Sequence, residues 1–485
     1  MNKHASSSRA VLFAFVCALN CNGIALPHAQ DITSGGAIIE PPPFEERVRV
    51  AKKRTPPARR PSSTTSSSSH ASPPTRRPSS ATQIAANASP NRAARRPASS
   101  PRTTATTPTT RSAPPAQPTT RAASTTATTA TPSVTAESLN EQGLALSNNN
   151  RYAEAVEVFQ RAIRLDPNFA DAHFNLGFAY HELERHAEAV ASLQQALRLD
   201  GADADANYYL GSSLSKLRQY EQAASAYTES IRLKSDNADA LSELGDAYYN
   251  LNRFDEAITA YTRATKLAPN DADTFYNLGD TLRKKDRNAE AVEAYRQTVR
   301  LRPAFAEAQY KLGYTLGKLR RFAESAEAFK QAVAAKPDYP EAHNNLGWSY
   351  NNLSRFPEAV ESLQQAVRLK PDLAVAHLNL GVAYTRLGKK NESILAFQEA
   401  VRLRPDWAEA HNNLGYAFGA LARWNDAIEA HKKAISLRPD YAAAHFNLGY
   451  AYHRSGAKKL AREQVTILQR LNPQLANLLI LQTRK

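Results

Sequence analysis

Sulfur is nearly absent from this chain of 485 residues, which contains two cysteines and one methionine. Both cysteines, Cys17 and Cys21, lie in the leader described below, so removal of that leader leaves no thiol. The sequence therefore excludes a disulfide scaffold, cysteine zinc sites, iron–sulfur clusters and thiol catalysis in the mature chain.

Long apolar runs and catalytic motifs are missing as well. The only sizeable apolar run, Ala10–Leu19, has ten residues, whereas a membrane helix needs about 20. Glycine-rich phosphate loops, Gly-x-Ser-x-Gly and His-Glu-x-x-His do not occur. We therefore predict a non-enzyme with no catalytic residues, no metal site, no cofactor and no transmembrane span in the mature chain.

The amino terminus has the layout of a secretory signal peptide. Lys3 and Arg9 precede the apolar run, and small residues follow it. We predict a signal peptide over residues 1–25, cleaved after Ala25 or, as a second choice, after Ala29. The chain is then expected to be exported, as a periplasmic, surface-associated or secreted protein.

Residues 26–135 form a tail rich in Pro, Ser, Thr, Ala and Arg, with almost no aromatic side chains. Of the 28 prolines, 17 lie within residues 31–135. Such a segment cannot bury enough apolar surface to offset the entropy of ordering it, so we predict disorder. Residues 31–135 also hold +11 of the formal charge of +15, and the chain from residue 136 carries only +2.

The basic tail has two interpretations. One is a solvated spacer kept extended by its charge, which we favour. The other is an electrostatic tether to an anionic polymer of the cell envelope. Because the charge belongs to the tail, the folded part is not expected to bind nucleic acid.

A repeat of 34 residues, without insertion, fills the rest of the chain. Its most regular feature is a glycine, taken here as position 8 of each unit. Position 7 is Leu in nine units, position 20 is Ala in eight, and position 32 is Pro in eight. The ten predicted units are 136–169, 170–203, 204–237, 238–271, 272–305, 306–339, 340–373, 374–407, 408–441 and 442–475.

Each unit has the pattern of two helices. Apolar residues at positions 4, 7 and 11 share one helical face, and those at 17, 20, 24 and 27 share a face of a second helix. Small residues at positions 8, 20 and 27 allow close approach, and the proline ends the second helix. A single pair cannot bury its apolar faces, so neighbouring pairs must stack into a solenoid.

This pattern resembles the tetratricopeptide repeat over residues 136–475. The resemblance implies an all-α fold, a right-handed α-α superhelix of ten helix pairs. We interpret residues 476–485 as a C-terminal cap, which solenoids need for solubility. Their apolar character leaves a dimer contact as the alternative.

Histidine recurs at position 4, which could indicate metal ligands. Equivalent positions in stacked pairs should lie near 10 Å apart, too far for one zinc ion with bonds of about 2.0 Å. We predict that they are packing residues. These histidines are His173, His343, His377, His411 and His445.

In tetratricopeptide arrays the first helices line the concave side, where positions 5, 6, 9, 12 and 13 are expected to face. Asparagine recurs at position 6, and the context His-x-Asn-Leu-Gly is similar to the repeats of O-GlcNAc transferase. That resemblance implies amides that bond the backbone of an extended peptide, centred here on units seven to ten. Only ten residues follow unit ten, so transferase activity is not expected. The asparagines are Asn175, Asn277, Asn345, Asn379, Asn413 and Asn447.

Aromatic residues at positions 5 and 9 complete the predicted groove, because rings with polar tips bury partner side chains while remaining soluble. They are Phe174, Phe178, Tyr276, Tyr310, Tyr314, Trp348, Tyr416, Phe446 and Tyr450.

The leading hypothesis is an exported, non-catalytic scaffold that binds extended segments of one or more proteins in this groove. It requires that the inner wall is not filled by the chain itself. One alternative makes the basic tail the active part, as an envelope anchor. Another makes the chain an accessory subunit of an enzyme on a different chain.

Overall fold

The computed structural model describes residues 39–40 and 134–483. The predicted signal peptide and nearly all of the predicted tail lie outside the described residues. The chain divides into two units, residues 1–57 with 136–485, and residues 58–135. All features below belong to the first unit.

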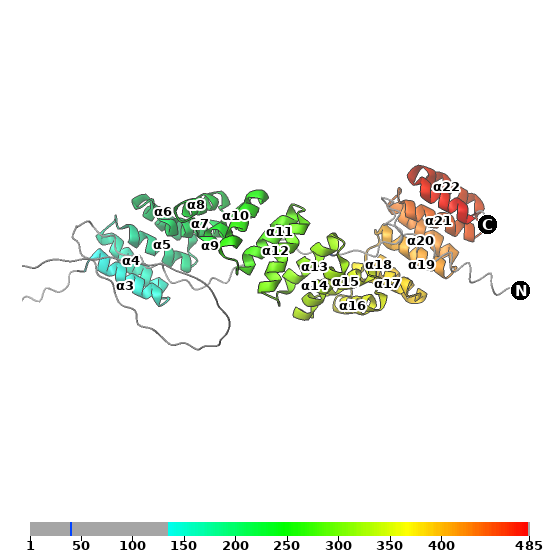
Figure 1. The fold of residues 1–485 in the computed structure, drawn as a ribbon, viewed down its shortest axis with the longest axis horizontal. Coiled ribbons are helices and arrows are strands. Elements are labelled where there is room, and N and C mark those ends of the chain that lie inside the picture. Colours follow the sequence, from blue (N-terminus) through cyan, green and yellow to red (C-terminus); the bar gives the residue numbers. More distant parts are fainter. Residues whose placement is uncertain (1–38, 41–133, 484–485) are drawn as a thin grey trace, which may run out of the picture. The chain divides into compact units, whose positions relative to one another are not determined.

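The described residues form helices arranged in successive pairs, and no strands (Figure 1). The first helices are α3 (Ala136–Asn148), α5 (Ala170–Glu182), α7 (Ala204–Lys216), α9 (Ala238–Asn250), α11 (Ala272–Lys284), α13 (Ala306–Lys318), α15 (Pro340–Asn352), α17 (Ala374–Arg386), α19 (Ala408–Ala420) and α21 (Ala442–Arg454). The second helices are α4 (Tyr152–Leu165), α6 (His186–Leu199), α8 (Tyr220–Leu233), α10 (Phe254–Leu267), α12 (Asn288–Leu301), α14 (Phe322–Ala335), α16 (Phe356–Leu369), α18 (Lys390–Leu403), α20 (Trp424–Leu437) and α22 (Lys458–Leu471).

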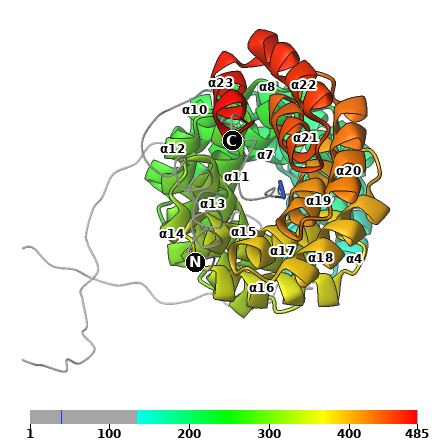
Figure 2. The ribbon, with the colours of Figure 1, turned by 90° about the vertical axis from the view of Figure 1, so that its right-hand side faces the viewer.

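These pairs stack into a superhelical solenoid, which confirms the predicted all-α fold class. Figure 2 looks along the array and shows helices surrounding the short segment of residues 39–40. Within the described part of the chain, no helix combines the length and the apolar character that crossing a membrane requires.

Glycine at position 8 sets the distance between the two helices of a pair. A Cβ added at Gly347 would lie 2.4 Å from Cγ of Leu363, which is closer than side-chain atoms can approach. Leu363 is fully buried, so it has no free space into which to move. The large residue at position 24 therefore packs directly on the backbone of the first helix.

The carbonyl of the proline at position 32 is held by the histidine of the next unit. Nε2 of each position-4 histidine lies 2.9–3.0 Å from this carbonyl oxygen, which satisfies a backbone acceptor past the end of the second helix. The predicted packing role of these histidines is confirmed. The pairs are His173 with Pro167, His343 with Pro337, His377 with Pro371, His411 with Pro405, and His445 with Pro439.

The C-terminal helix α23 (Pro473–Thr483) begins before residue 476, where the sequence placed the start of the cap. Leu475 and Leu479 are buried against Phe446 and Leu468 of the last pair. Leu479 also fills the space above Gly449, where a Cβ would lie 2.5 Å from its Cδ2. This helix therefore covers the apolar face that a further repeat would have covered.

A left-handed residue joins the two helices of every pair. Position 15 has φ between 55° and 90° in all ten turns, and glycine occupies it only twice. The other residues therefore adopt a conformation that costs roughly 1 kcal/mol for a side chain with a Cβ. These positions are Asn150, Glu184, Arg218, Asn252, Asp286, Arg320, Ser354, Gly388, Ala422 and Gly456.

The substitution Ala422→Gly is expected to raise the free energy of unfolding by about 1 kcal/mol, because glycine adopts φ 59° without the Cβ clash. Denaturant unfolding followed by circular dichroism measures the change. Ala191→Gly is the matched control, since Ala191 is exposed inside α6 and its loss should cost about 1 kcal/mol. Destabilisation by both variants would contradict the strain argument.

Candidate functional site

The asparagines of the predicted ladder lie on the first helices, and three of them make the same contact with the preceding unit. Each donates to the asparagine at position 5 of the preceding unit, which the sequence analysis did not identify as a partner. The bonds run from Asn175 to Asn140 at 2.9 Å, from Asn379 to Asn344 at 2.9 Å, and from Asn447 to Asn412 at 3.0 Å. These amides therefore connect neighbouring units.

Two other ladder residues have different surroundings. Asn277 donates to Oδ1 of Asp246 at 2.9 Å. Asn413 is half-buried, and no hydrogen bond joins its amide to another residue of the described part. Asn413 therefore keeps both donor and acceptor capacity for another molecule.

Asn345 on α15 binds a segment of the chain that lies 306 residues away in sequence. Its Oδ1 accepts from the backbone N–H of Ile39 at 2.8 Å, and its Nδ2 donates to the carbonyl oxygen of Ile39 at 2.9 Å. An extended residue offers these two groups on the same side, as in a hydrogen-bonded pair of antiparallel strands. The side-chain amide of Asn345 thus makes the two hydrogen bonds that a neighbouring strand would make. At Asn345 the chain itself therefore occupies the wall, and a partner that binds there must displace residues 39–40.

Tyr310 on α13 strengthens this contact. Its hydroxyl donates to the same carbonyl of Ile39 at 2.7 Å and accepts from Nδ2 of Asn345 at 2.9 Å. Nδ2 of Asn344 donates to Oδ1 of Asn345 at 2.9 Å. All four hydrogen-bonding capacities of the Asn345 amide are therefore used. Burial raises the pKa of Tyr310, so its hydroxyl remains a neutral donor.

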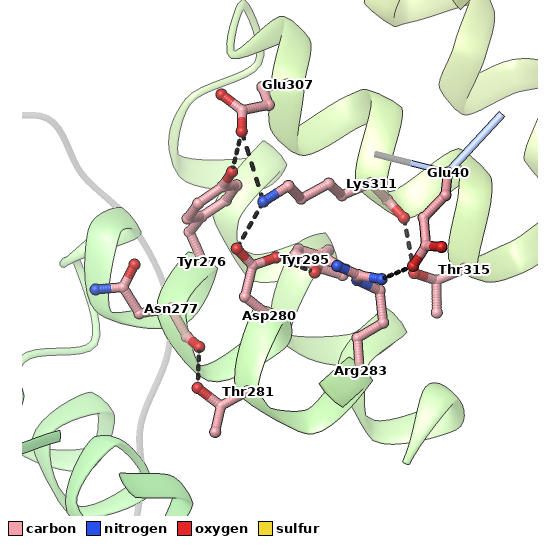
Figure 3. A network of polar contacts seen from close by, with 10 residues as sticks. All are labelled: Glu40, Tyr276, Asn277, Asp280, Thr281, Arg283, Tyr295, Glu307, Lys311 and Thr315. Carbon is pink, nitrogen blue, oxygen red and sulfur yellow. Dashed lines mark hydrogen bonds and ion pairs between the residues drawn. The ribbon is translucent and has the colours of Figure 1, made fainter. Parts of the chain in front are cut away.

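The next residue of the segment, Glu40, forms an ion pair with Arg283 on α11. Nη1 of Arg283 donates to Oε1 of Glu40 at 3.0 Å (Figure 3). The Arg283 side chain is only 8% exposed, whereas that of Glu40 is 69% exposed. Burial lowers the pKa of Arg283, but Tyr295, Asp280 and Glu40 outweigh it and the pKa lies above its ordinary value. The guanidinium is therefore a fixed cation at the wall.

Beneath Arg283 lies a buried polar network, which Figure 3 shows from close by. Lys311, fully buried, donates to Oδ2 of Asp280 at 2.6 Å and lies 3.5 Å from Glu307. The hydroxyl of Tyr295 donates to the other oxygen of Asp280. Burial raises the pKa of Tyr295 well above its ordinary value. Lys311, which interrupts the ladder in sequence, is thus the centre of a network between α11 and α13.

The position-5 aromatics pack mostly inside the array. Phe174 is fully buried, with its ring centroid 6.1 Å from that of Tyr209. Tyr276 is 2% exposed and packs 5.1 Å from Phe305. Phe446 is buried under the C-terminal helix. Of this group, Tyr310 is the one whose polar end contacts the segment at residues 39–40.

The position-9 aromatics differ in exposure. Phe178 is 1% exposed and packs 5.0 Å from Tyr209. Tyr314 lies 5.9 Å from the guanidinium of Arg283. The remaining three, Trp348, Tyr416 and Tyr450, are half-buried. The ring of Trp348 lies 5.4 Å from that of Phe322, and the ring of Tyr450 lies 6.2 Å from that of Trp424.

Ile39, Glu40 and Arg283 were not identified from the sequence. A signal does exist, because Ile38-Ile39 is the only pair of adjacent large aliphatic residues within residues 31–135. An aliphatic pair in a tail otherwise poor in apolar residues indicates a segment that binds something.

Family models described as TPR repeat and tetratricopeptide repeat match the chain. The first matches residues 143–184, 216–252, 245–286, 383–421 and 422–456, and the second matches residues 170–203, 276–340 and 310–374. The chain belongs to the tetratricopeptide repeat family. Its repeats make it a protein–protein interaction scaffold, of a fold that is typically non-catalytic.

Solved structures with a similar fold include YrrB, described as a TPR protein with an unusual peptide-binding site. The identity is 24%, the match covers 39% of this chain and 96% of that one, and the TM-score is 0.36. MamA is 26% identical over 36% of this chain and 94% of its own, with a TM-score of 0.34. The hetero-tetramer Cut9–Hcn1 of the APC/C is 15% identical. The match covers 72% of this chain and 96% of that one, with a TM-score of 0.41. Comparison with curated protein sequences gave no match.

Proposed function

We propose that this protein is a non-catalytic scaffold that binds extended segments of partner proteins along its inner wall. The contact of Asn345 with both backbone groups of Ile39 carries the proposal. Such a grip needs an extended backbone but no particular side chain, because every residue except proline offers the same N–H and C=O. One wall can therefore accept segments of different sequence.

The wall beyond Asn345 offers the same chemistry to a longer partner. Asn413 presents an amide without a partner in the described part of the chain. The half-buried rings of Trp348, Tyr416 and Tyr450 provide apolar surface at intervals along the first helices. We expect a segment held at Asn345 and extended toward α19 to reach the amide of Asn413 and the ring of Tyr416.

We also propose that the scaffold works outside the cytoplasm. The leader-like arrangement of Lys3, Arg9 and the apolar run supports export, although residues 1–25 lie outside the described part. The tail-centred and accessory-subunit alternatives have no contact in the described residues that favours them.

Replacing Asn345 and Asn413 together by alanine is expected to weaken the binding of extended peptides at least tenfold. The reason is the loss of paired backbone hydrogen bonds at both positions. Peptides are first selected from a random display library against the full chain. Fluorescence anisotropy of the labelled peptides then gives the dissociation constants.

The matched control is Asn425→Ala, because Asn425 is an exposed asparagine of α20, a second helix. It should bind the selected peptides as the wild-type chain does. Unchanged binding by the Asn345/Asn413 double variant, with its helical circular-dichroism spectrum intact, would overturn the proposed function.

A further inference from the structure

We propose that Ile39 and Glu40 are an internal ligand of one peptide site on α11, α13 and α15. We further propose that this site selects partner segments with an acidic residue directly after the residue held by Asn345. This inference rests on the proposed function and assigns the site a sequence preference and a built-in competitor.

The first part of the site fixes the register of the bound segment. Three hydrogen bonds join Asn345 and Tyr310 to the backbone of one residue, Ile39, whose N–H donates one of them. The contact therefore singles out one residue of the segment rather than a stretch. Since Ile39 is half-buried, a charged side chain at this place would lose part of its hydration.

The second part of the site contacts the side chain of the next residue, Glu40. Arg283 projects a nearly buried guanidinium toward that position, and Glu40 is its one ion-pair partner among the described residues. Both oxygens of the neighbouring Asp280 are already engaged, by Lys311 and Tyr295. Asp280 is thus unavailable for a bidentate pair with Arg283. A carboxylate supplied by the bound segment is the complementary group.

The surroundings of the arginine are fixed by contacts that do not involve Glu40. Lys311 and Tyr295 fix Asp280, and Tyr314 lies beside the guanidinium. A guanidinium that approaches a carboxylate from such fixed surroundings loses less conformational freedom on binding than one on an open surface. This explains how a carboxylate as exposed as that of Glu40 can still contribute to recognition. An isolated surface pair would contribute almost nothing.

The internal segment must compete with any partner for this site. Because Ile39 and Glu40 belong to the same chain as Asn345 and Arg283, their local concentration does not fall on dilution. The apparent affinity for a partner is then the intrinsic affinity multiplied by the fraction of open sites. Only partners that bind more strongly, or at several positions of the wall, displace the segment.

The test compares the full wild-type chain with a full chain that carries Ile39→Pro and Glu40→Arg. Proline lacks the backbone N–H that donates to Oδ1 of Asn345, and arginine places a second positive charge beside Arg283. The probe is a fluorescein-labelled synthetic peptide with the sequence Gly-Ala-Ile-Ile-Glu-Pro-Pro-Pro of residues 36–43. Its dissociation constant, from fluorescence anisotropy, is expected to be at least tenfold lower for the substituted chain.

The acidic preference is tested in this substituted chain with a second peptide in which the glutamate is glutamine. The glutamate peptide is expected to bind about fivefold more tightly, and Arg283→Gln should abolish the difference. Arg300→Gln is the matched control, because Arg300 is exposed on α12 and should leave the preference intact.

Equal binding of the peptide to both chains would overturn the internal ligand. Equal binding of the two peptides to the substituted chain would overturn the acidic preference. Residues 39–40 of a second copy of the chain could instead occupy the site, and sedimentation velocity tests this. A wild-type dimer that becomes a monomer in the Ile39→Pro, Glu40→Arg chain would also overturn the proposal. Failure of this peptide to bind either chain would overturn it too. The proposed function then still stands if the selected peptides depend on Asn345 and Asn413.

Discussion

The substitution Lys311→Met is expected to lower the free energy of unfolding of the array by about 3–5 kcal/mol. Lys311 is fully buried, and its ammonium donates at 2.6 Å to Asp280, which is 1% exposed. Removal of the cation leaves a buried carboxylate whose one remaining described donor is the hydroxyl of Tyr295. The folded state must then protonate Asp280 or admit water, and both cost free energy.

Guanidinium unfolding followed by circular dichroism measures this loss. Lys330→Met is the matched control, because Lys330 is exposed on α14 and its replacement should change stability by less than about 0.5 kcal/mol. Adding Asp280→Asn to Lys311→Met should restore most of the stability, since the neutral amide still accepts from Tyr295. Equal stability of the two methionine variants would refute a buried ion pair.

Acid is expected to destabilise the array through His431. This histidine is 2% exposed at position 24 of its unit, and burial lowers its pKa to about 3. The unfolded chain binds a proton near pH 6.5, but the folded chain does not. Stability is therefore complete above pH 6.5 and falls as the pH drops toward 3, by about 1.4 kcal/mol per unit. At pH 5 the expected loss is about 2 kcal/mol.

His431→Phe should remove this loss, because phenylalanine at position 24 already packs under the glycine of other units, as Phe397 does under Gly381. Unfolding is measured between pH 8 and pH 5 for both chains. A smaller pH dependence should remain, since burial also lowers the pKa of His181, to about 4. If both chains lost stability equally on acidification, His431 could not be the responsible group.

The sequence predicted the fold because the information is local and repeated. Each 34-residue unit contains the residues that specify its two helices, the close contact between them at position 8 and the helix end at position 32. Ten units in register remove the ambiguity that a single unit would leave. The position-4 histidines were assigned correctly for the same reason. Their partner is a backbone carbonyl six residues earlier.

The site was less predictable because its decisive contacts are neither local nor periodic. Asn345 was found from its place in the ladder, but Ile39 is 306 residues away, and no spacing rule connects them. Lys311 stands where six units have asparagine, so the pattern marks it only as an interruption of the ladder, and position 12, which Arg283 occupies, has no recurring residue that would single it out. The position-5 asparagines were missed because their role depends on a side chain in the next unit.

Ten repeats offer a bound segment ten almost equivalent positions on the wall. Repetition alone would therefore allow the same segment to bind in a register shifted by one unit in either direction. The cluster of Arg283, Asp280 and Lys311 occurs in one pair of neighbouring units. A shift by 34 residues of wall would place Glu40 opposite Gly317 or Tyr249 instead of a cation. The one pair of units that departs from the repeat thus fixes the register in which a segment binds to an otherwise periodic surface.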